Sequence, residues 1–203
     1  MPKISTEHEL RQRETILQAA TACFCHKGYH RTTIQDICDE ARLSKGGVYT
    51  YFKSKEEILG AVVEQSGASA FQHAVDVARE GGPVLTRLDR IAEGVLDRLT
   101  AKTPNTHSPQ LSLEIWAEAS KNSEVKTLCS QTYELWRKLL GDLLREGIAT
   151  GEVKPWVDPE AFAMLLVACF DGLSLQEGIT RVRVDWQRIT QMMRRGFSEG
   201  ILA

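Results

Sequence analysis

The segment from Thr33 to Phe52 has the residue types and spacing of two short helices joined by a tight turn. Residues 41–55 contain no carboxylate, and their four positive charges are those of Arg42, Lys45, Lys53 and Lys55. A local excess of positive charge without nearby carboxylates favours contact with nucleic-acid phosphates. We therefore predict that the second helix of this segment binds DNA.

The predicted second helix has the composition that a major-groove helix needs. Such a helix requires a close backbone approach, short side chains near base edges, and phosphate contacts at its flanks. Gly46 and Gly47 each cost about 1 kcal/mol in a helix relative to alanine, so their presence here indicates that a partner comes close. Lys45 can reach a phosphate or guanine acceptors, and Thr50 a base edge or a thymine methyl group.

Phosphate contacts are predicted on both sides of that helix. Tyr49 and Tyr51 can reach phosphate oxygens through their hydroxyls, although two residues of this spacing do not share a helix face and one of them can be partly buried instead. Thr33 and Lys55 stand at the amino ends of neighbouring helices, where the helix dipole favours anions. The predicted DNA-contacting residues are Thr33, Arg42, Ser44, Lys45, Gly46, Gly47, Tyr49, Thr50, Tyr51 and Lys55.

Three helices position these residues. An amphipathic stripe through residues 16–24 predicts a first helix over 9–27, with Gly28 as its stop. Thr32 or Thr33 can cap the second helix, with Gln35 completing a capping box from Thr32, and this helix ends near Arg42. Ser44 caps the third helix, which is predicted to extend through Tyr51 with Val48 and Phe52 pointing inward.

The rest of the chain is predicted to be helical as well. A capping box at 54–57 begins a long connecting helix that no Pro or Gly pair interrupts before Gly81. Further breaks at 102–109, 121–123, 147–155 and 178–184 give about five more helices, two of which begin at Pro109 and Pro159. The prediction is an all-α fold of about nine helices, divided into segments 1–53, 54–82 and 83–203.

Composition narrows the class of protein. The 203 residues are 42% hydrophobic with a net charge of −2, so a folded globular chain is expected and bulk charge alone does not predict a nucleic-acid partner. The five cysteines are odd in number and show no metal-ligand spacing, which indicates reduced residues in a cytoplasmic protein without a metal or cofactor. The longest apolar run covers residues 161–170, about half of a membrane span, so no membrane association is expected.

The segment from about residue 11 to 60 resembles the TetR (tetracycline-repressor) family of bacterial transcription regulators. The residues that carry the resemblance are Ile16, Leu17, Ala19, Ala20, Phe24, Gly28, Tyr29, Thr32, Thr33, Ile37, Ala41, Ser44, Lys45, Gly46, Tyr49, Tyr51, Phe52 and Lys55. The resemblance implies a three-helix DNA-binding head with a helix-turn-helix, a helical ligand-binding body, and a homodimer on a palindromic operator. Trp116–Ala119, Asp158–Ala161 and Asp171–Leu173 also look like one subgroup of bodies in that family.

Two positions depart from the family pattern. Arg42 stands where the family usually has a glycine, in a turn that can require left-handed backbone, and such strain would cost about 1 kcal/mol or more. Its charge could contribute a phosphate contact. Gly47 stands where the family often carries Thr, Ser or Ala, so one candidate base contact is missing. Specificity would then depend on Lys45, Thr50 and DNA shape.

The body suggests an interface and a pocket. The apolar run 161–170 and the last helix predict an intersubunit bundle, the alternative being monomer core; the interface candidates are Leu165, Cys169, Ile189, Met192, Met193 and Phe197. The candidate pocket walls are Trp116, Cys129, Tyr133, Trp136, Phe162, Leu166 and Phe170, with Glu114, Glu118 and Gln131 as polar contacts. Mostly apolar and aromatic walls favour a small lipophilic or aromatic effector.

The expected function is a ligand-responsive, sequence-specific transcriptional regulator, a repressor that its effector releases from the operator. Ligand binding would shift the population away from the head spacing, about 34–36 Å, that adjacent major grooves require. Three alternatives are weighed against it. A redox sensor on the same fold would use Cys23, Cys25 or Cys129; a helical adaptor would bind protein only; an enzyme is disfavoured, since the sequence shows no catalytic motif.

Overall fold

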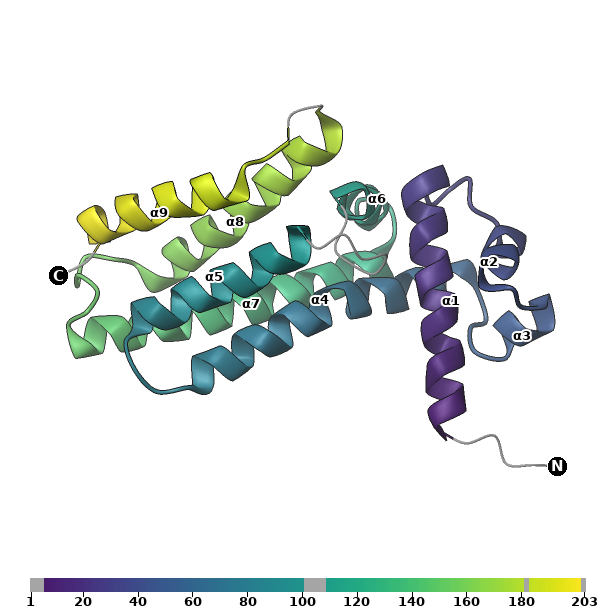
Figure 1. Cartoon of the computed structure of the whole chain (residues 1–203), viewed down its shortest axis with the longest axis horizontal. Helices are drawn as coiled ribbons and strands as arrows, with labels where there is room; N and C mark the ends of the chain where they lie inside the picture. The colour runs from purple at the N-terminus through teal and green to yellow at the C-terminus, as the bar shows by residue number, and fades with distance from the viewer. Residues whose placement is uncertain (1–5, 101–108, 181–182, 202–203) are drawn as a thin grey trace. The chain divides into compact units, whose positions relative to one another are not determined.

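The computed structural model describes the backbone of residues 6–100, 109–180 and 183–201, and the side chains of 7–97, 109–180 and 183–195. Within these ranges the chain forms nine helices (Figure 1), which confirms the predicted all-α fold. They are α1 (Thr6–Lys27), α2 (Ile34–Ala41), α3 (Lys45–Tyr49), α4 (Lys55–Arg79), α5 (Val84–Thr100), α6 (Pro109–Ala119), α7 (Ser123–Thr150), α8 (Pro159–Ile179) and α9 (Trp186–Ile201). The predicted break at 102–109 lies almost wholly outside the described residues.

Local sequence signals explain most helix ends. Gly28 ends α1 with a φ of 81°, a left-handed conformation that glycine adopts without strain. The Asp158 side chain accepts a hydrogen bond from the Ala161 amide, and Pro159 opens α8, as predicted. The predicted capping box of Thr32 with Gln35 is wrong. Thr33 is the N-cap of α2 and its box partner is Asp36, because the helix begins at Ile34 and so places Thr33, in extended backbone, at the N-cap and Asp36 at N3.

Helix α3 is shorter than the sequence predicts. It ends at Tyr49, two residues before the predicted end at Tyr51. The last turn still closes, since the Phe52 amide bonds to the Val48 carbonyl at 3.1 Å. Val48 and Phe52 are both buried, as their spacing predicts.

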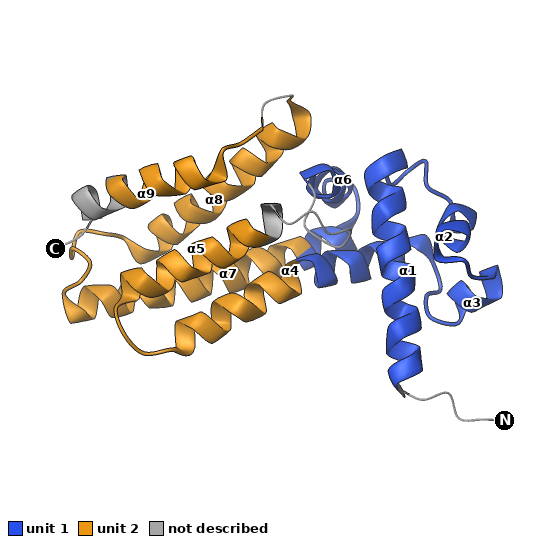
Figure 2. Cartoon of the chain, in the orientation of Figure 1, with its two compact units in different colours: residues 1–66, 102–128 blue, residues 67–101, 129–203 orange. Residues whose placement is uncertain are grey.

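The chain packs as two compact units (Figure 2). Unit 1 contains residues 1–66 and 102–128, and unit 2 contains residues 67–101 and 129–203. Helix α6 therefore belongs to the same unit as α1, α2 and α3, and it contacts α1 directly. These units are defined by packing, whereas the predicted segments 1–53, 54–82 and 83–203 are defined by function, so that functional division stays a prediction.

The core of unit 1 follows the predicted stripes. The buried apolar side chains of α1 are Ile16, Leu17, Ala19, Ala20, Cys23 and Phe24, and those of α2 are Ile37, Cys38 and Ala41. Apolar residues three, four and seven positions apart lie on one face of a helix, which is why these stripes meet. Burial of this face fixes α2 against α1, and α3 contacts α2 in turn.

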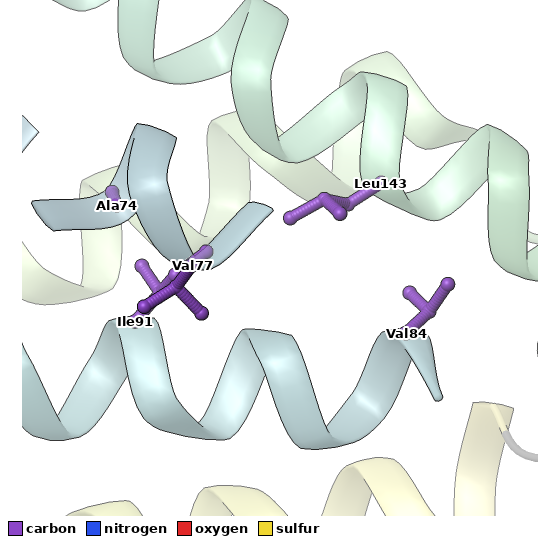
Figure 3. Close-up of a cluster of buried hydrophobic side chains, with 5 residues drawn as sticks. All are labelled: Ala74, Val77, Val84, Ile91 and Leu143. Atoms are coloured by element: carbon purple, nitrogen blue, oxygen red, sulfur yellow. The ribbon is translucent and has the colours of Figure 1, made fainter. Parts of the chain in front are cut away.

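The core of unit 2 brings α4, α5 and α7 together. Figure 3 shows side chains of these three helices directed toward one another: Ala74, Val77, Val84, Ile91 and Leu143. A smaller cluster joins α7 to α8 through Leu140, Leu144 and Ala163. One charged side chain is buried at the edge of the first cluster. Arg87 donates through Nη1 to the Ala78 carbonyl at 2.9 Å and pairs through Nη2 with Glu146, which compensates its burial, while its Nε has no hydrogen-bond partner.

Helix α8 has an apolar surface that its own chain does not cover. Met164, Leu165 and Ile179 are 53%, 59% and 64% exposed, and Met192 of α9 is 62% exposed. By length and composition α8 could cross a membrane, with a mean hydropathy of 1.4 over a window of which 11% is buried. The same properties suit a helix that another protein surface covers, because large exposed apolar patches mark interaction sites.

Candidate nucleic-acid interface

Helix α3 presents the side chains that the sequence predicts for DNA contact. The Ser44 hydroxyl caps the helix by accepting the Gly47 amide at 3.1 Å. Lys45, Gly46, Tyr49 and Thr50 are exposed, while Val48, on the opposite face, is fully buried. A Cβ on Gly46 would lie 3.9 Å from the Ser44 Oγ, an ordinary van der Waals distance, so the neighbouring side chains leave room for one and its absence serves no internal packing. An exposed, side-chain-free backbone is what a close partner needs.

Thr50 is already engaged through its hydroxyl. Its Oγ1 donates to the Gly46 carbonyl at 2.8 Å, inside its own turn of helix. The hydroxyl can still accept a hydrogen bond, and its methyl group is free to meet an apolar atom. Of the two predicted contacts for Thr50, this geometry favours the thymine methyl.

Tyr49 and Tyr51 differ in exposure. Tyr49 is 50% exposed and Tyr51 is half-buried. This matches the expectation that two tyrosines of this spacing cannot share one face. Phosphate contact stays a prediction for both, and the exposed Tyr49 side chain is the less constrained of the two.

Arg42 adopts the left-handed conformation considered for it. Its φ and ψ are 55° and 40°, and among the described residues it alone combines a side chain with positive φ. The Arg42 amide donates to the Asp39 carbonyl at 3.2 Å and the Leu43 amide to the Cys38 carbonyl at 2.9 Å. These bonds close the carboxyl end of α2 in the way a glycine usually does. The side chain is exposed and can reach a phosphate.

The amino end of α2 is occupied by a carboxylate of its own chain. The Thr33 amide and hydroxyl both donate to Asp36 Oδ2 at 2.8 Å. Lys27 Nζ lies 2.5 Å from Asp36 Oδ1, and the hydrogen bonds from Lys27 and Thr33 hold the pKa of Asp36 well below its usual range. Thr33 therefore acts as a helix cap here. The phosphate contact predicted for Thr33 stays a prediction. To make it, the Thr33 amide or hydroxyl would have to release Asp36.

Lys55 is also directed into the protein. Its Nζ donates to the carbonyls of Tyr29 and Thr32, each at 2.9 Å, and lies 4.3 Å from the centre of the Tyr29 ring. An ammonium group has three donors, so at most one remains for a phosphate. Lys55 fixes the turn between α1 and α2, a role that the sequence analysis missed. Its phosphate contact stays a prediction.

Two of the predicted effector contacts lie against the same turn. Glu114 accepts a hydrogen bond from the Tyr29 amide at 2.7 Å, and Glu118 Oε2 lies 3.2 Å from His30 Nε2. Both carboxylates are thus engaged with unit 1, and the structure gives no support to their prediction as effector contacts. The third, Gln131, is exposed on α7. Spacing in the sequence could not reveal these contacts, because they join residues 85 and 88 positions apart.

The candidate pocket walls are distributed over both units. Trp116 belongs to unit 1 and the other six belong to unit 2. Trp136 packs on Phe71 with ring centres 5.4 Å apart and on the first cluster of unit 2, while Phe162 and Leu166 pack on the second cluster. Phe170 stacks at 5.2 Å on Trp186. These contacts pack several of the candidates against the core clusters of unit 2. Trp186 was not among the residues predicted from the sequence.

A partly buried carboxylate accompanies the aromatic candidates. Asp171 accepts a hydrogen bond from Tyr133, which lowers its pKa, but burial has the larger effect and raises the pKa above its usual value. The Trp186 indole donates to Glu177 at 3.0 Å. From the sequence, Asp171 was noted only as part of the family-like segment Asp171–Leu173, and Glu177 was not noted. The signal available was their position on α8, an apolar helix in which any acidic side chain is unusual.

The cysteines have the environment of packed residues. Burial raises the pKa of Cys23, Cys38 and Cys129, and nearby carboxylates add to the effect at Cys23 and Cys38. A raised pKa disfavours the thiolate, which is the reactive form. Within the described part of the chain, no group of three or more His, Cys, Asp or Glu residues is arranged to hold a metal ion.

The interface candidates differ in exposure. Leu165 and Met192 are among the most exposed large apolar residues, Cys169 is exposed, and Ile189 and Met193 are half-buried. The Phe197 side chain lies outside the described residues. All five described candidates therefore retain surface that a second subunit could cover.

Known proteins are similar to this chain in sequence and in fold. Residues 16–62 match the family model for bacterial regulatory proteins of the tetR family, and residues 85–200 match that of the BetI-type transcriptional repressor, C-terminal. The HTH-type regulator YfiR of Bacillus subtilis is 28% identical over 175 residues, 85% of this chain and 82% of that one. The HTH-type repressor DhaR of Mycobacterium sp. is 26% identical over 173 residues, 84% of each chain.

A solved structure has the same architecture. A transcriptional regulator from Saccharomonospora viridis, in complex with choline, superposes with a TM-score of 0.81 at 23% identity, over 96% of this chain and 99% of that one. At this identity the likeness shows the fold. The two family matches and the exposed recognition helix together show that the chain belongs to the TetR family of bacterial regulatory proteins and is a ligand-responsive, DNA-binding transcriptional regulator.

Proposed function

We propose that this regulator is a cytoplasmic repressor without catalytic activity, which binds a palindromic operator as a homodimer and leaves it when a small effector binds. The observation that carries the proposal is helix α3. It exposes Lys45, Gly46, Tyr49 and Thr50 on one surface, in a stretch of sequence without carboxylates. A surface of this composition can approach base edges while its flanks contact phosphates.

Dimerisation is supported by α8 and α9. Their apolar residues Leu165 and Met192 are more than half exposed, and covering them would remove apolar surface from water at about 25 cal/mol per Å². A symmetric dimer places the same patch of both subunits in contact, which suits one continuous apolar face. The two heads would then contact successive major grooves on one side of the duplex.

We consider two classes of effector, of which the first consists of small lipophilic or aromatic molecules. Tyr133 and Phe170 are only half-buried, and Phe170 lies on the apolar helix α8 and packs on Trp186. Pockets for such ligands combine apolar walls with a few polar groups.

A second effector class is favoured by one observation. Asp171 is a partly buried carboxylate that accepts a hydrogen bond from Tyr133, and Phe170, the residue before it, packs on Trp186. A carboxylate with aromatic rings suits an organic cation, since ring faces attract positive charge. The similar regulator from Saccharomonospora viridis was solved with choline, a cation of this class.

DNA binding is tested by selecting bound duplexes from a random library at about 0.15 M salt. The Lys45→Ala, Tyr49→Phe double variant is run beside the natural protein. We expect enrichment of a palindrome that the variant fails to enrich. No enrichment, or the same enrichment by the variant, would contradict the proposed reading helix and favour an adaptor that binds only protein.

The effector class is tested by release from that duplex. Lipophilic aromatic compounds and quaternary ammonium compounds are compared on the natural protein and on Asp171→Asn. If the effector is a cation, the variant is expected to lose its response to ammonium compounds while retaining operator binding. If the variant responded to ammonium compounds as the natural protein does, the role of Asp171 in binding a cation would be contradicted. The lipophilic or aromatic class would then be the effector class that remains. Release by peroxide alone, reversed by dithiothreitol, would instead indicate the redox sensor.

A further inference from the structure

Helix α6 comes from the regulatory segment of the sequence but packs with the helices that bind DNA. It lies within residues 85–200, which match the C-terminal repressor model, yet it packs in unit 1 with α1, α2 and α3. A helix of the regulatory segment is therefore built into the unit that carries the recognition helix. The contacts that hold it there are specific polar contacts to one turn, residues 28–32, which joins α1 to α2.

The first contact is a hydrogen bond between α6 and the backbone of that turn. Glu114 Oε2 accepts the Tyr29 amide at 2.7 Å. The other carboxylate oxygen, Oε1, would lie 3.0 Å from a Cβ on Gly28, whose φ is 81°. Gly28 thus serves two purposes, since it ends α1 and leaves room for the carboxylate. A hydrogen bond to an ionised acceptor is about twice as strong as one between neutral groups.

The second contact lies one helical turn further along α6. Glu118 is 8% exposed, and its Oε2 lies 3.2 Å from His30 Nε2, an ion-pair distance without the geometry of a hydrogen bond. Residues four apart project from the same face of a helix, so Glu114 and Glu118 hold consecutive residues of the turn. Helix α6 cannot slide or rotate without moving this turn or breaking both contacts.

The turn is equally fixed on its other sides. Lys55 of α4 binds the carbonyls of Tyr29 and Thr32, and the Thr32 hydroxyl donates to the Cys23 carbonyl of α1 at 3.2 Å. The next residue, Thr33, is the N-cap of α2. A displacement of the turn is therefore passed directly to the amino end of α2, and from there to α3.

We propose that Glu114 is a positioning residue that couples the position of α6 to the DNA-binding arrangement of α2 and α3, with Glu118 as its second contact. The inference rests on the proposed function and names the residues through which an effector would act. Coupling is reciprocal, so operator binding must also restrain α6. This consequence can be measured before any effector is identified.

The experiment is hydrogen exchange of the full chain with and without its selected operator duplex. In the natural protein, the operator is expected to slow exchange in peptides from both 34–49 and 109–119. Glu114→Ala is expected to retain slowing in 34–49, to lose it in 109–119, and to bind the operator about tenfold more weakly, as for loss of one hydrogen bond to a charged group. Glu114→Gln keeps an acceptor oxygen and should restore most of the response.

Two further variants complete the test. Glu124→Ala, at an exposed glutamate at the start of α7, is the matched control and should behave as the natural protein. His30→Ala removes an exposed side chain and leaves the core intact, so it should weaken the response of 109–119 even if Glu114→Ala unfolds.

The outcomes separate the two proposals. An operator that leaves 109–119 unchanged in the natural protein, or a full response in Glu114→Ala and His30→Ala, overturns the coupling while DNA binding stands. Failure to select any duplex overturns the proposed function itself.

Discussion

Replacement of Arg42 by glycine should separate stability from DNA binding. Arg42 has a φ of 55° and a ψ of 40°, a conformation that costs a residue with a side chain about 1–2 kcal/mol. Glycine adopts it freely but gains about 0.5–1 kcal/mol of conformational freedom in the unfolded chain. The difference predicts that Arg42→Gly raises the free energy of unfolding by about 1 kcal/mol, or the melting temperature by about 2–4 °C.

The same substitution should weaken operator binding, because it removes an exposed charge beside the recognition helix. If Arg42 contacts a phosphate, its loss lowers the salt slope of the logarithmic affinity by about 0.9. Arg42→Ala is the matched control, since it removes the charge and keeps the strained conformation. Both variants should lose the same affinity, and only Arg42→Gly should gain stability.

The assays are thermal or urea unfolding and a salt series of operator binding. Backbone bonds from Arg42 to Asp39 and from Leu43 to Cys38 do not involve the side chain, so both variants can retain them. If Arg42→Gly were no more stable than Arg42→Ala, the strain argument would be refuted. If the affinity were unchanged in both, the predicted phosphate contact would be wrong.

Three further predictions concern single side chains. Lys45→Ala should weaken operator binding and lower its salt slope by about 0.9, as measured by titration at several salt concentrations. Gly147→Ala should destabilise the protein by about 1 kcal/mol in urea unfolding, because the added Cβ would lie 2.7 Å from Val153 Cγ2; Gly81→Ala, with nothing within 4 Å, is its neutral control. Asp36→Asn should weaken the dependence of the free energy of unfolding on pH in the acid range. The pKa of Asp36 is lowered in the folded state, so its stabilisation is present above the unfolded value of about 4 and is lost as the pH falls below it, which unfolding measured from about pH 6 to 2 would detect.

The periodicity of apolar residues predicted most of the fold. Ile16, Leu17 and Phe24 are buried on α1 as their spacing predicts, and Val48 and Phe52 are buried around α3. These predictions succeed because a helix repeats every 3.6 residues, so the spacing of apolar residues within the helix itself determines which face is buried. Choices between adjacent residues were less secure. The N-cap of α2 is Thr33 and its partner is Asp36, because capping geometry depends on one backbone conformation that the sequence left open.

The candidate site was predicted unevenly for the same reason. Exposure of Lys45, Tyr49 and Thr50 follows from helix periodicity. The inward direction of Lys55 does not, because its acceptors are the carbonyls of Tyr29 and Thr32, more than twenty residues earlier. From the sequence, a lysine near the start of a helix is equally compatible with binding a phosphate and with binding carbonyl groups of its own chain. Only the location of those carbonyls decides between them.

The sequence by itself determined that this chain is helical, that residues 33–52 form two short helices joined by a turn, and that residues 41–55 carry four positive charges and no carboxylate. Each of these properties depends on neighbours within one or two helical turns. The tertiary structure decided which groups hold the turn at residues 28–32. Glu114 and Glu118 lie about ninety positions beyond it in the chain, and they meet it only because α6 packs on α1. Burial of apolar faces brings such distant segments together, and the polar contacts that result are fixed by that packing and by no local pattern.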